Sequence, residues 1–463
     1  MSTLTIRGAE LLVTMDRQRT EIANGGMIIR NGIIEAINTS AELPQVTGEQ
    51  IDLSDHIILP GLVNTHHHLY QTLTRAVPAA QNANLFDWLR TLYPIWSHLT
   101  PKAVYTSAII GMAELLLSGC TTTTDHLYLF PNGSRLDDTI RAAQEIGIRF
   151  HASRGSMSLG ESDGGLPPDS IVEKETDILT DSRRLIETYH DPRHGSMLRI
   201  VIAPCSPFSV TPDLMRASVE LARAYGIQLH THLAETRDED QFCVETFGKR
   251  PVRYAEELGW TGPDVWFAHM VHVNTPEIEL LARTGCGIAH CPSSNMRLAS
   301  GTAPVHRYQD MGVKLGLGVD GSASNDSSHM LSETRQAMLL SRLSQASGSD
   351  ETPSTAMMTA REALEIATLG GAAVLQRDDI GSLEVGKCGD FFALDLNRLG
   401  YAGSLHDPVA ATILCAPQQA DIVVVNGKVV VEKGHIQSLD MDPLIKQHNQ
   451  IAYEMINQGN TQC

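Results

Sequence analysis

The sequence has no long apolar run. Nowhere in its 463 residues is there a stretch near the roughly 18 unbroken apolar residues that a membrane-spanning helix needs. Residues 1–16 also lack the basic start, apolar core and small-residue cleavage site of a secretory signal peptide. We therefore expect no membrane span and a cytoplasmic location.

Cysteine is scarce, and positive charge is outnumbered by negative charge. The eight cysteines include no C-x-x-C pair, which argues against a disulfide framework and against a cysteine-rich zinc site. Lys and Arg total 35 while Asp and Glu total 54, for a net charge of −19. A chain this acidic lacks the basic surface of a protein that binds nucleic acid or anionic membrane, so neither is an expected partner. Small neutral ligands fit this charge.

The two ends of the chain resemble each other. In each, an Asn-Gly pair lies between β-rich runs, at Asn31-Gly32 and at Asn426-Gly427. This pair is a strong signal for a type I′ hairpin, because both turn residues need a positive φ. Neither end has enough strands to bury two sheet faces alone. We therefore expect residues 1–58 and 379–463 to form one small β-sandwich with a terminal helix, and residues 59–378 to fold as a separate unit.

The middle of the chain alternates between strand and helix patterns. Eight apolar, β-rich runs occur at residues 57–64, 120–124, 148–152, 200–203, 227–232, 265–268, 287–290 and 314–319. Eight β/α units predict an α/β fold, the (β/α)₈ TIM barrel, whose active site lies at the carboxyl ends of the strands.

The segments between these runs carry helix start and stop signals. Three of them begin with Thr-Pro and end at Gly, as expected for a capping Thr, a Pro in the first turn and a left-handed Gly. They run from Thr100 to Gly119, from Thr211 to Gly226 and from Thr275 to Gly285. Two connections, 69–99 and 155–194, are long, and we expect them to form lids or pocket walls.

The strongest site signal follows the first barrel strand, which runs into His66, His67 and His68. Because side chains alternate along a strand, His66 and His68 project to one side and His67 to the other. An imidazole pair at this spacing can chelate one metal ion. The plainer alternative is a polar strand end with solvated histidines.

Three further strand ends carry similar residues. Strand five offers His230 and His232, which share a face and which spacing alone cannot separate, and Glu235 follows three residues later. A carboxylate beside a metal suits proton transfer. Strand six ends at His269 and strand eight at Asp320, although a helix cap would also explain Asp320. Together these strand ends predict a metalloenzyme site at the catalytic end of the barrel.

These motifs resemble those of the metal-dependent amidohydrolase superfamily, within its cytosine deaminase and chlorohydrolase branch. The matching segments are 60–68, 232–235, 268–269 and 318–321, and the resemblance covers essentially the whole chain. It implies that Glu235 shuttles protons, that His269 positions the attacking water, and that Asp320 takes part in catalysis. The implied ligands of one divalent metal, Zn²⁺ or Fe²⁺, are His66, His68, His232 and Asp320.

The resemblance also bears on the number of metals. Binuclear members carry a carboxylated lysine at the end of strand four. Here that strand runs into Pro204, Cys205 and Ser206 with no lysine. A single metal per chain is therefore implied.

The presumed pocket walls are similar to those of bacterial 8-oxoguanine deaminases, at residues 70–76, 154–161, 203–208 and 290–301. This likeness implies hydrolytic deamination of 8-oxoguanine to urate and ammonia. The candidate substrate-binding residues are Gln71, whose amide both donates and accepts, Arg154, whose donors suit a ring carbonyl, and Cys205. A loop-anchoring salt bridge is the alternative for Arg154, and an inert buried thiol is the alternative for Cys205.

Other functions compete with this one. The same site would serve a hydrolase of isoxanthopterin, guanine or an s-triazine, and only the pocket loops discriminate among these rings. A non-enzymatic barrel is disfavoured because every implied ligand is kept. The small cytidine-type zinc deaminases need P-C-x-x-C, which Pro204-Cys205-Ser206-Pro207 lacks. The resemblance further implies a small heterocyclic substrate and a homo-oligomer, dimer or larger.

Overall fold

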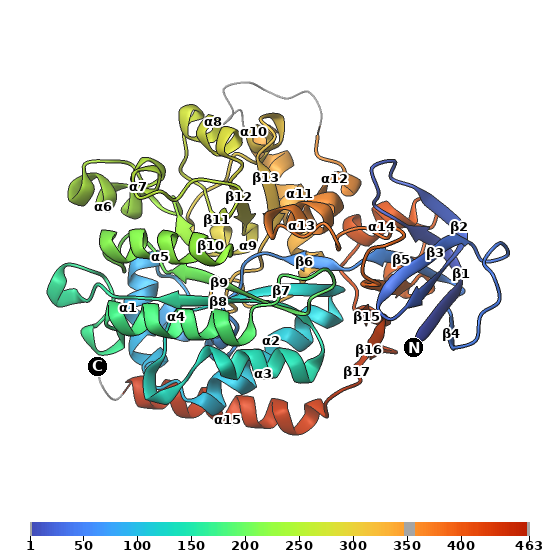
Figure 1. The fold of residues 1–463 in the computed structure, drawn as a ribbon, viewed down its shortest axis with the longest axis horizontal. Coiled ribbons are helices and arrows are strands. Elements are labelled where there is room, and N and C mark those ends of the chain that lie inside the picture. Colours follow the sequence, from blue (N-terminus) through green and yellow to red (C-terminus); the bar gives the residue numbers. More distant parts are fainter. Residues whose placement is uncertain (1, 347–356, 461–463) are drawn as a thin grey trace.

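The computed structural model describes residues 2–346 and 357–460, and it contains a closed barrel flanked by a sheet (Figure 1). Eight parallel strands form the barrel in sequence order, and the last pairs with the first to close it. They are β6 (Leu62–Asn64), β7 (Cys120–Leu127), β8 (Arg149–Ser156), β9 (Leu198–Pro204), β10 (Gln228–Leu233), β11 (Val265–His269), β12 (Gly287–His290) and β13 (Lys314–Leu317). The predicted TIM barrel is confirmed.

The flanking sheet is built from both ends of the chain, as predicted. Its strands are β1 (Thr3–Val13), β2 (Glu21–Arg30), β3 (Ile33–Thr39), β4 (Glu49–Asp52), β5 (His56–Pro60), β14 (Phe391–Asp395), β15 (Ile422–Val425), β16 (Lys428–Glu432) and β17 (His435–Ile436). Antiparallel pairing of β14 with β5 joins the two ends. Both predicted hairpin turns have positive φ, at 50° and 85° for Asn31-Gly32 and at 50° and 71° for Asn426-Gly427.

The first predicted barrel strand is in fact two strands. Residues 56–60 form β5 in the flanking sheet, and the chain then enters the barrel as β6. Gly61 lies at the break, where an added Cβ would come within 1.9 Å of the Thr121 hydroxyl oxygen. The expected boundary after residue 58 therefore falls inside β5, because β5 stays paired with β14 as far as Pro60.

Helices cover the outside of the barrel, with short ones at its ends. They are α1 (Leu85–Trp96), α2 (Pro101–Leu117), α3 (Leu136–Ile146), α4 (Glu175–Tyr189), α5 (Pro212–Tyr225), α6 (Arg237–Phe247), α7 (Pro251–Glu257), α8 (Thr275–Thr284), α9 (Pro292–Arg297), α10 (Val305–Asp310), α11 (Met330–Ala346), α12 (Ala360–Glu365), α13 (Gly371–Val374), α14 (Pro408–Leu414) and α15 (Met441–Asn460).

Two of the three predicted caps are confirmed. The Thr100 hydroxyl accepts a hydrogen bond from the amide of Ala103 at 3.2 Å, and Thr211 caps α5 in the same way. The third prediction is wrong by one residue. Asn274, not Thr275, caps α8, and its side chain accepts from the Glu277 amide at 3.1 Å while the Glu277 carboxylate accepts from the Asn274 amide. Helix α8 therefore begins one residue earlier than the Thr-Pro pattern predicts, because the capping box satisfies two backbone amides at its start.

The C-terminal helix α15 braces the first long connection. Residues 69–99 fold into η1 (Leu69–Thr74), η2 (Pro78–Ala80) and α1, and α15 packs against η1, α1 and α2 (Figure 1). Across the described ranges, the structure contains no helix that is long and apolar enough to cross a membrane.

Candidate active site

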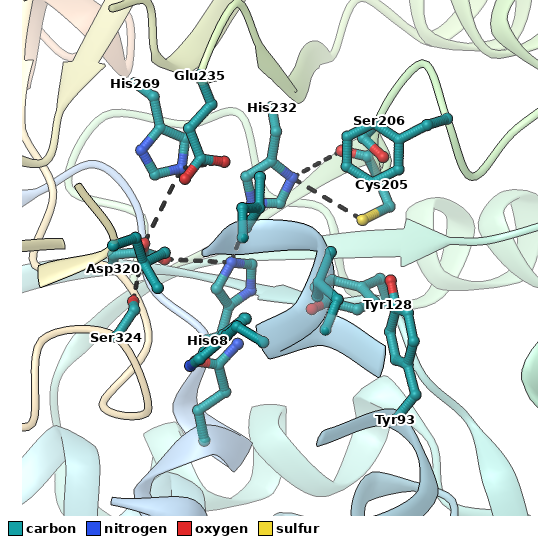
Figure 2. Close-up of a pocket in the computed structure, with 16 residues that line it drawn as sticks. His68, Tyr93, Tyr128, Cys205, Ser206, His232, Glu235, His269, Asp320 and Ser324 are labelled. Atoms are coloured by element: carbon teal, nitrogen blue, oxygen red, sulfur yellow. Dashed lines mark hydrogen bonds and ion pairs between the residues drawn. The ribbon is translucent and has the colours of Figure 1, made fainter. Parts of the chain in front are cut away.

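Side chains from four barrel strands converge at the carboxyl end of the barrel (Figure 2). The Nε2 atoms of His66 and His68 each lie 3.3 Å from Oδ1 of Asp320. The Nε2 atoms of His68 and His232 are 3.0 Å apart. These four residues were predicted to meet, and the barrel brings them together in a cluster in which His66, His68 and Asp320 are buried and His232 is partly exposed.

Backbone carbonyls fix the tautomers of two of these histidines. His68 Nδ1 contacts the carbonyl oxygen of His126 at 2.7 Å, and His232 Nδ1 contacts that of Cys205 at 2.7 Å. Because a carbonyl only accepts, each Nδ1 must carry the hydrogen and each Nε2 must present a lone pair. Two lone pairs therefore face each other across the 3.0 Å gap between His68 and His232.

A longer relay fixes His66. His230 Nδ1 donates to the carbonyl of Trp266 at 3.0 Å, so His230 Nε2 is an acceptor for His66 Nδ1 at 2.8 Å. His66 Nε2 is then left as a lone pair, and it is buried with no hydrogen-bond partner. His230 thus orients His66 and does not face the cluster, which settles the ambiguity that spacing left open.

The cluster is a set of bare acceptors that fits a cation. Burial lowers the pKa of His66, His68 and His232, to about 3 for His232, so all three rings are neutral at physiological pH. The Asp320 carboxylate accepts hydrogen bonds from the hydroxyls of Ser294 and Ser324 and from the Gly321 amide, which favour its charged form. Three imidazole nitrogens and one carboxylate are ligands that Zn²⁺ and Fe²⁺ accept.

Glu235 and His269 stand beside this cluster. His269 Nε2 lies 3.6 Å from Glu235 Oε2 and 3.9 Å from Asp320 Oδ2, while its Nδ1 contacts Oδ1 of Asn295 at 3.0 Å. Burial raises the pKa of Glu235 above its ordinary value. For His269 burial acts to lower the pKa, but the two neighbouring carboxylates outweigh it and raise the pKa.

The strand ends that carry these residues have unusual backbone conformations. Ala234, His269 and Asp320 have φ of 52°, 73° and 61°, in the left-handed region that non-glycine residues rarely adopt. The turn before Glu235 is held by the buried Glu239, whose carboxylate accepts from the amides of Ala234 and Glu235, both at 2.8 Å. Such strain persists where surrounding contacts enforce it, and here it aims side chains into the cluster.

A buried carboxylate also anchors η1 beside the cluster. Asp125 Oδ1 accepts from the amide of Leu69 at 2.9 Å, its Oδ2 has no partner, and burial raises the Asp125 pKa to about 7. This folded-state pKa lies above the unfolded value of about 4. At any pH between these two pKa values, Asp125 is therefore protonated in the folded chain and ionised in the unfolded chain. The contribution of Asp125 to stability is therefore complete below pH ~4 and is lost as pH rises through about 7.

Asp125→Asn is expected to remove that pH dependence. The free energy of unfolding, variant minus wild type, should grow by about 1.4 kcal/mol per pH unit between pH ~4 and ~7 and level off above. Urea unfolding of both proteins across this range measures it. A difference that stays flat with pH would show that Asp125 ionises normally.

A pocket of about 390 Å³, with the open solvent at its mouth included, opens onto the cluster. Its wall consists of His68, Gln71, Leu85, Trp88, Leu89, Tyr93, Tyr128, Cys205, Ser206, Phe208, His232, Glu235, His269, Leu298, Asp320 and Ser324. Among these wall residues there is no lysine or arginine. The wall therefore offers no permanently cationic side chain to an anionic group of a ligand.

Comparison with known proteins places the chain in a family. Residues 57–437 match the amidohydrolase family. The chain belongs to the amidohydrolase family. It is 48% identical to 8-oxoguanine deaminase of Pseudomonas aeruginosa over 94% of this chain and 95% of that protein. It is 36% identical to an isoxanthopterin deaminase from an unknown prokaryotic organism, over 92% and 90% of the two chains.

Solved structures agree with this assignment. An atrazine chlorohydrolase from Arthrobacter aurescens, crystallised as a zinc complex, superposes with a TM-score of 0.91 at 34% identity, covering 97% of this chain and 100% of that one. The resemblance to the amidohydrolase superfamily that the sequence motifs indicated is therefore confirmed.

Two of the three predicted substrate-binding residues of this amidohydrolase line the cavity. Gln71 lies on η1 with its Oε1 unpartnered, and it packs so close to Gly321 that a Cβ there would come within 1.8 Å of that oxygen. Cys205 follows β9 with its Sγ 3.8 Å from His232 Nδ1. Burial raises the Cys205 pKa to about 12, so its thiol stays protonated.

Arg154 does not reach the cavity, and the structure contradicts its predicted role. It lies on the outer side of β8, where its guanidinium donates to both oxygens of Glu173 at 2.8 and 2.9 Å and to Asp181 at 3.2 Å. It also covers the ring of Phe130 at 4.2 Å. Arg154 is the loop-anchoring salt bridge that was the alternative reading.

The two long connections have different outcomes. Residues 69–99 supply Gln71, Leu85, Trp88, Leu89 and Tyr93 to the wall, as predicted. Residues 155–194 supply none, so that part of the prediction is wrong. They pack behind the wall, where the amide of Leu166 donates to the carbonyl of the wall residue Phe208 at 3.1 Å.

Sequence reasoning missed His126. The second strand was expected to end at residue 124, but β7 continues to Leu127 and carries His126 into the histidine cluster. Its Nε2 donates to the carbonyl of Ala203 at 2.7 Å, and its ring stacks on that of His232 at 4.8 Å. An Asp-His pair at the end of a threonine-rich strand was the available signal.

Proposed function

We propose that this amidohydrolase hydrolyses the C2 amino group of 8-oxoguanine, giving urate and ammonia. The observation that carries the reaction type is the convergence of three imidazole lone pairs and the Asp320 carboxylate beside the buried Glu235. The ring is proposed from the 48% identity, over nearly the full length of both chains, to a protein named 8-oxoguanine deaminase.

One divalent metal per chain is part of the proposal. His66, His68, His232 and Asp320 would hold it, because their acceptor atoms crowd together and no hydrogen lies between them. Zn²⁺ is the first choice and Fe²⁺ the second. When bound, such a metal supplies a strong nucleophile from water at neutral pH.

Glu235 is proposed as the proton shuttle. Its raised pKa lets it stay protonated to a higher pH than an ordinary carboxyl group, and it lines the cavity where the ring must lie. Delivery of that proton to ring nitrogen N3 makes the neighbouring C2 more electrophilic. After water attack at C2, Glu235 moves the proton of the new C2 hydroxyl to the departing amine, which leaves as ammonia, and the proton taken from the water then returns to Glu235.

His269 and Asp320 are proposed to orient the attacking water and take up its proton. Asp320 stays ionised because donors surround it: Ser294 Oγ at 2.6 Å, Ser324 Oγ at 3.1 Å and the Gly321 amide at 2.7 Å. Asn295 fixes the His269 ring from behind. Gln71 and Cys205 remain the proposed substrate-binding residues from the sequence, and they belong to the same wall.

A panel of rings tests the proposal. Ammonia release should be fastest with 8-oxoguanine, with urate as the co-product and about one metal equivalent bound per chain. Isoxanthopterin and guanine are compared in the same ammonia assay, and a chloro-s-triazine, which would release chloride, is followed by chloride release; relatives of this chain are named for isoxanthopterin and for atrazine. Faster turnover of any of these would replace the named substrate, and two metal equivalents at full activity would contradict the single site.

We also propose that the enzyme acts in the cytoplasm as a homo-oligomer of two or more copies, on the strength of its resemblance to the family. Light scattering on the purified chain measures the copy number. A monomer at working concentration would contradict this part of the proposal.

A further inference from the structure

Among the described residues that line the cavity, two buried side-chain atoms have no hydrogen-bond partner. One is Oε1 of Gln71, already proposed to bind substrate. The other is the hydroxyl of Tyr93, a residue that is 1% exposed and has no other assigned role. Buried hydroxyl groups in folded proteins are usually hydrogen-bonded, because a buried hydroxyl without a partner destabilises the fold.

Tyr93 is held rigidly in its position. It lies on α1, whose first turn is capped by Asn84, and its ring packs edge-on against Trp96 at a centroid distance of 5.9 Å. One turn earlier on α1, Trp88 Nε1 donates to the carbonyl of Ala323 at 3.3 Å, which ties the helix to the loop after β13. The hydroxyl is therefore placed before any ligand arrives, and binding would require little rearrangement.

Its location suits contact with the part of a ligand that does not react. Figure 2 shows Tyr93 and Cys205 on one side of the cavity, with Asp320 and His269 on the other. A ring whose reacting carbon lies at the histidine cluster would extend its remaining edge toward the Tyr93 side.

The chemistry of the wall defines what that edge must be. With Arg154 turned outward and no lysine or arginine in the wall, an oxygen on the ligand has to be recognised by neutral donors. Burial raises the pKa of Tyr93 well above its ordinary value, so the phenol keeps its hydrogen and can donate it. The Gln71 amide, which offers both an acceptor and a donor, packs instead against Gly321, next to Asp320.

We propose that the Tyr93 hydroxyl donates a hydrogen bond to a lactam oxygen of the substrate ring, on the edge away from the reacting carbon. This inference rests on the proposed function, because it takes the substrate to be a cyclic amide. It assigns to an uncharged phenol the recognition that the sequence had assigned to Arg154.

Tyr93→Phe is the test, because it removes one oxygen atom and keeps the ring. We expect kcat/KM for 8-oxoguanine to fall about 10- to 100-fold, since a buried carbonyl of the substrate is left unpaired. Metal content should not change. The melting temperature should stay equal or rise, because the free variant loses an unpaired hydroxyl.

Two further rings identify the oxygen. Guanine has only the C6 oxygen, and 2-amino-8-oxopurine has only the C8 oxygen. A fall shared by 8-oxoguanine and 2-amino-8-oxopurine assigns Tyr93 to the C8 oxygen, while a fall shared by 8-oxoguanine and guanine assigns it to the C6 oxygen. An equal fall on all three rings, or no fall, overturns the inference, because a merely structural role would not distinguish them.

Tyr254→Phe is the matched control. The Tyr254 hydroxyl is also buried and unpartnered, but the residue stacks on Phe247 at 4.0 Å, outside the cavity. This variant should leave kcat/KM unchanged for every ring. If the wild type releases no ammonia from 8-oxoguanine and acts on isoxanthopterin instead, the proposed function fails. The same comparison of Tyr93→Phe on that lactam ring then decides the inference separately.

Discussion

Glu235→Gln is expected to keep its metal and to lower kcat by about 10²–10⁴-fold, the usual range for a general acid–base group. The Glu235 side chain is 5% exposed, and its Oε1 lies 3.5 Å from the hydroxyl of Ser300. Glutamine has the same size and can keep this contact. It cannot take up and release the proton that the ring nitrogen and the departing amine need.

Metal content and kcat measured on the same preparation separate this effect from loss of the site. Asp320→Ala serves as the contrast, because removing that carboxylate takes away the charge that balances a cation, and both metal and turnover should be lost. A Glu235→Gln enzyme with near wild-type kcat would show that the shuttle lies elsewhere. Loss of metal from it would show that Glu235 is a ligand.

The barrel could be predicted because its strands are apolar runs separated by clear helix caps. The error at residues 57–64 had a physical cause. That run is apolar throughout, and only its pairing, with β14 before Gly61 and with β7 and β13 after it, divides it in two. Strand propensity reports burial and neighbours, which a single sequence does not contain.

The ligand-type residues could be predicted because parallel strands of a barrel deliver their ends to one place. The tautomer relay through His230 could not, since it depends on the carbonyl of Trp266, 36 residues away. Arg154 was misplaced for a similar reason. Its partners Glu173 and Asp181 lie in a later segment, and nothing in the strand itself shows which side of β8 faces them. Tyr93 belongs to the wall because of where α1 packs, and the sequence of α1 alone does not show that position.

The largest expected effect concerns guanine, which we expect to be turned over about 10⁴–10⁵-fold less efficiently than 8-oxoguanine. A site built to hydrogen-bond a polar group rejects an analogue that lacks it by this factor, because its own buried groups are left unpaired. Guanine differs at two adjacent atoms. It lacks the C8 oxygen, and its N7 accepts a hydrogen bond where N7 of 8-oxoguanine donates one.

The wall has the features that such discrimination requires. The wall residues on the Tyr93 side are uncharged, and the buried Tyr93 hydroxyl and Gln71 Oε1 have no hydrogen-bond partner in the protein. The measurement is the ratio of kcat/KM for the two purines with the same metal-loaded enzyme. If Tyr93 reads the C8 oxygen, Tyr93→Phe should narrow this ratio by slowing only the 8-oxo substrate. A wild-type ratio near one would mean that the cavity makes no selective contact with C8 or N7. The substrate would then have to be sought among rings that differ from 8-oxoguanine at other positions.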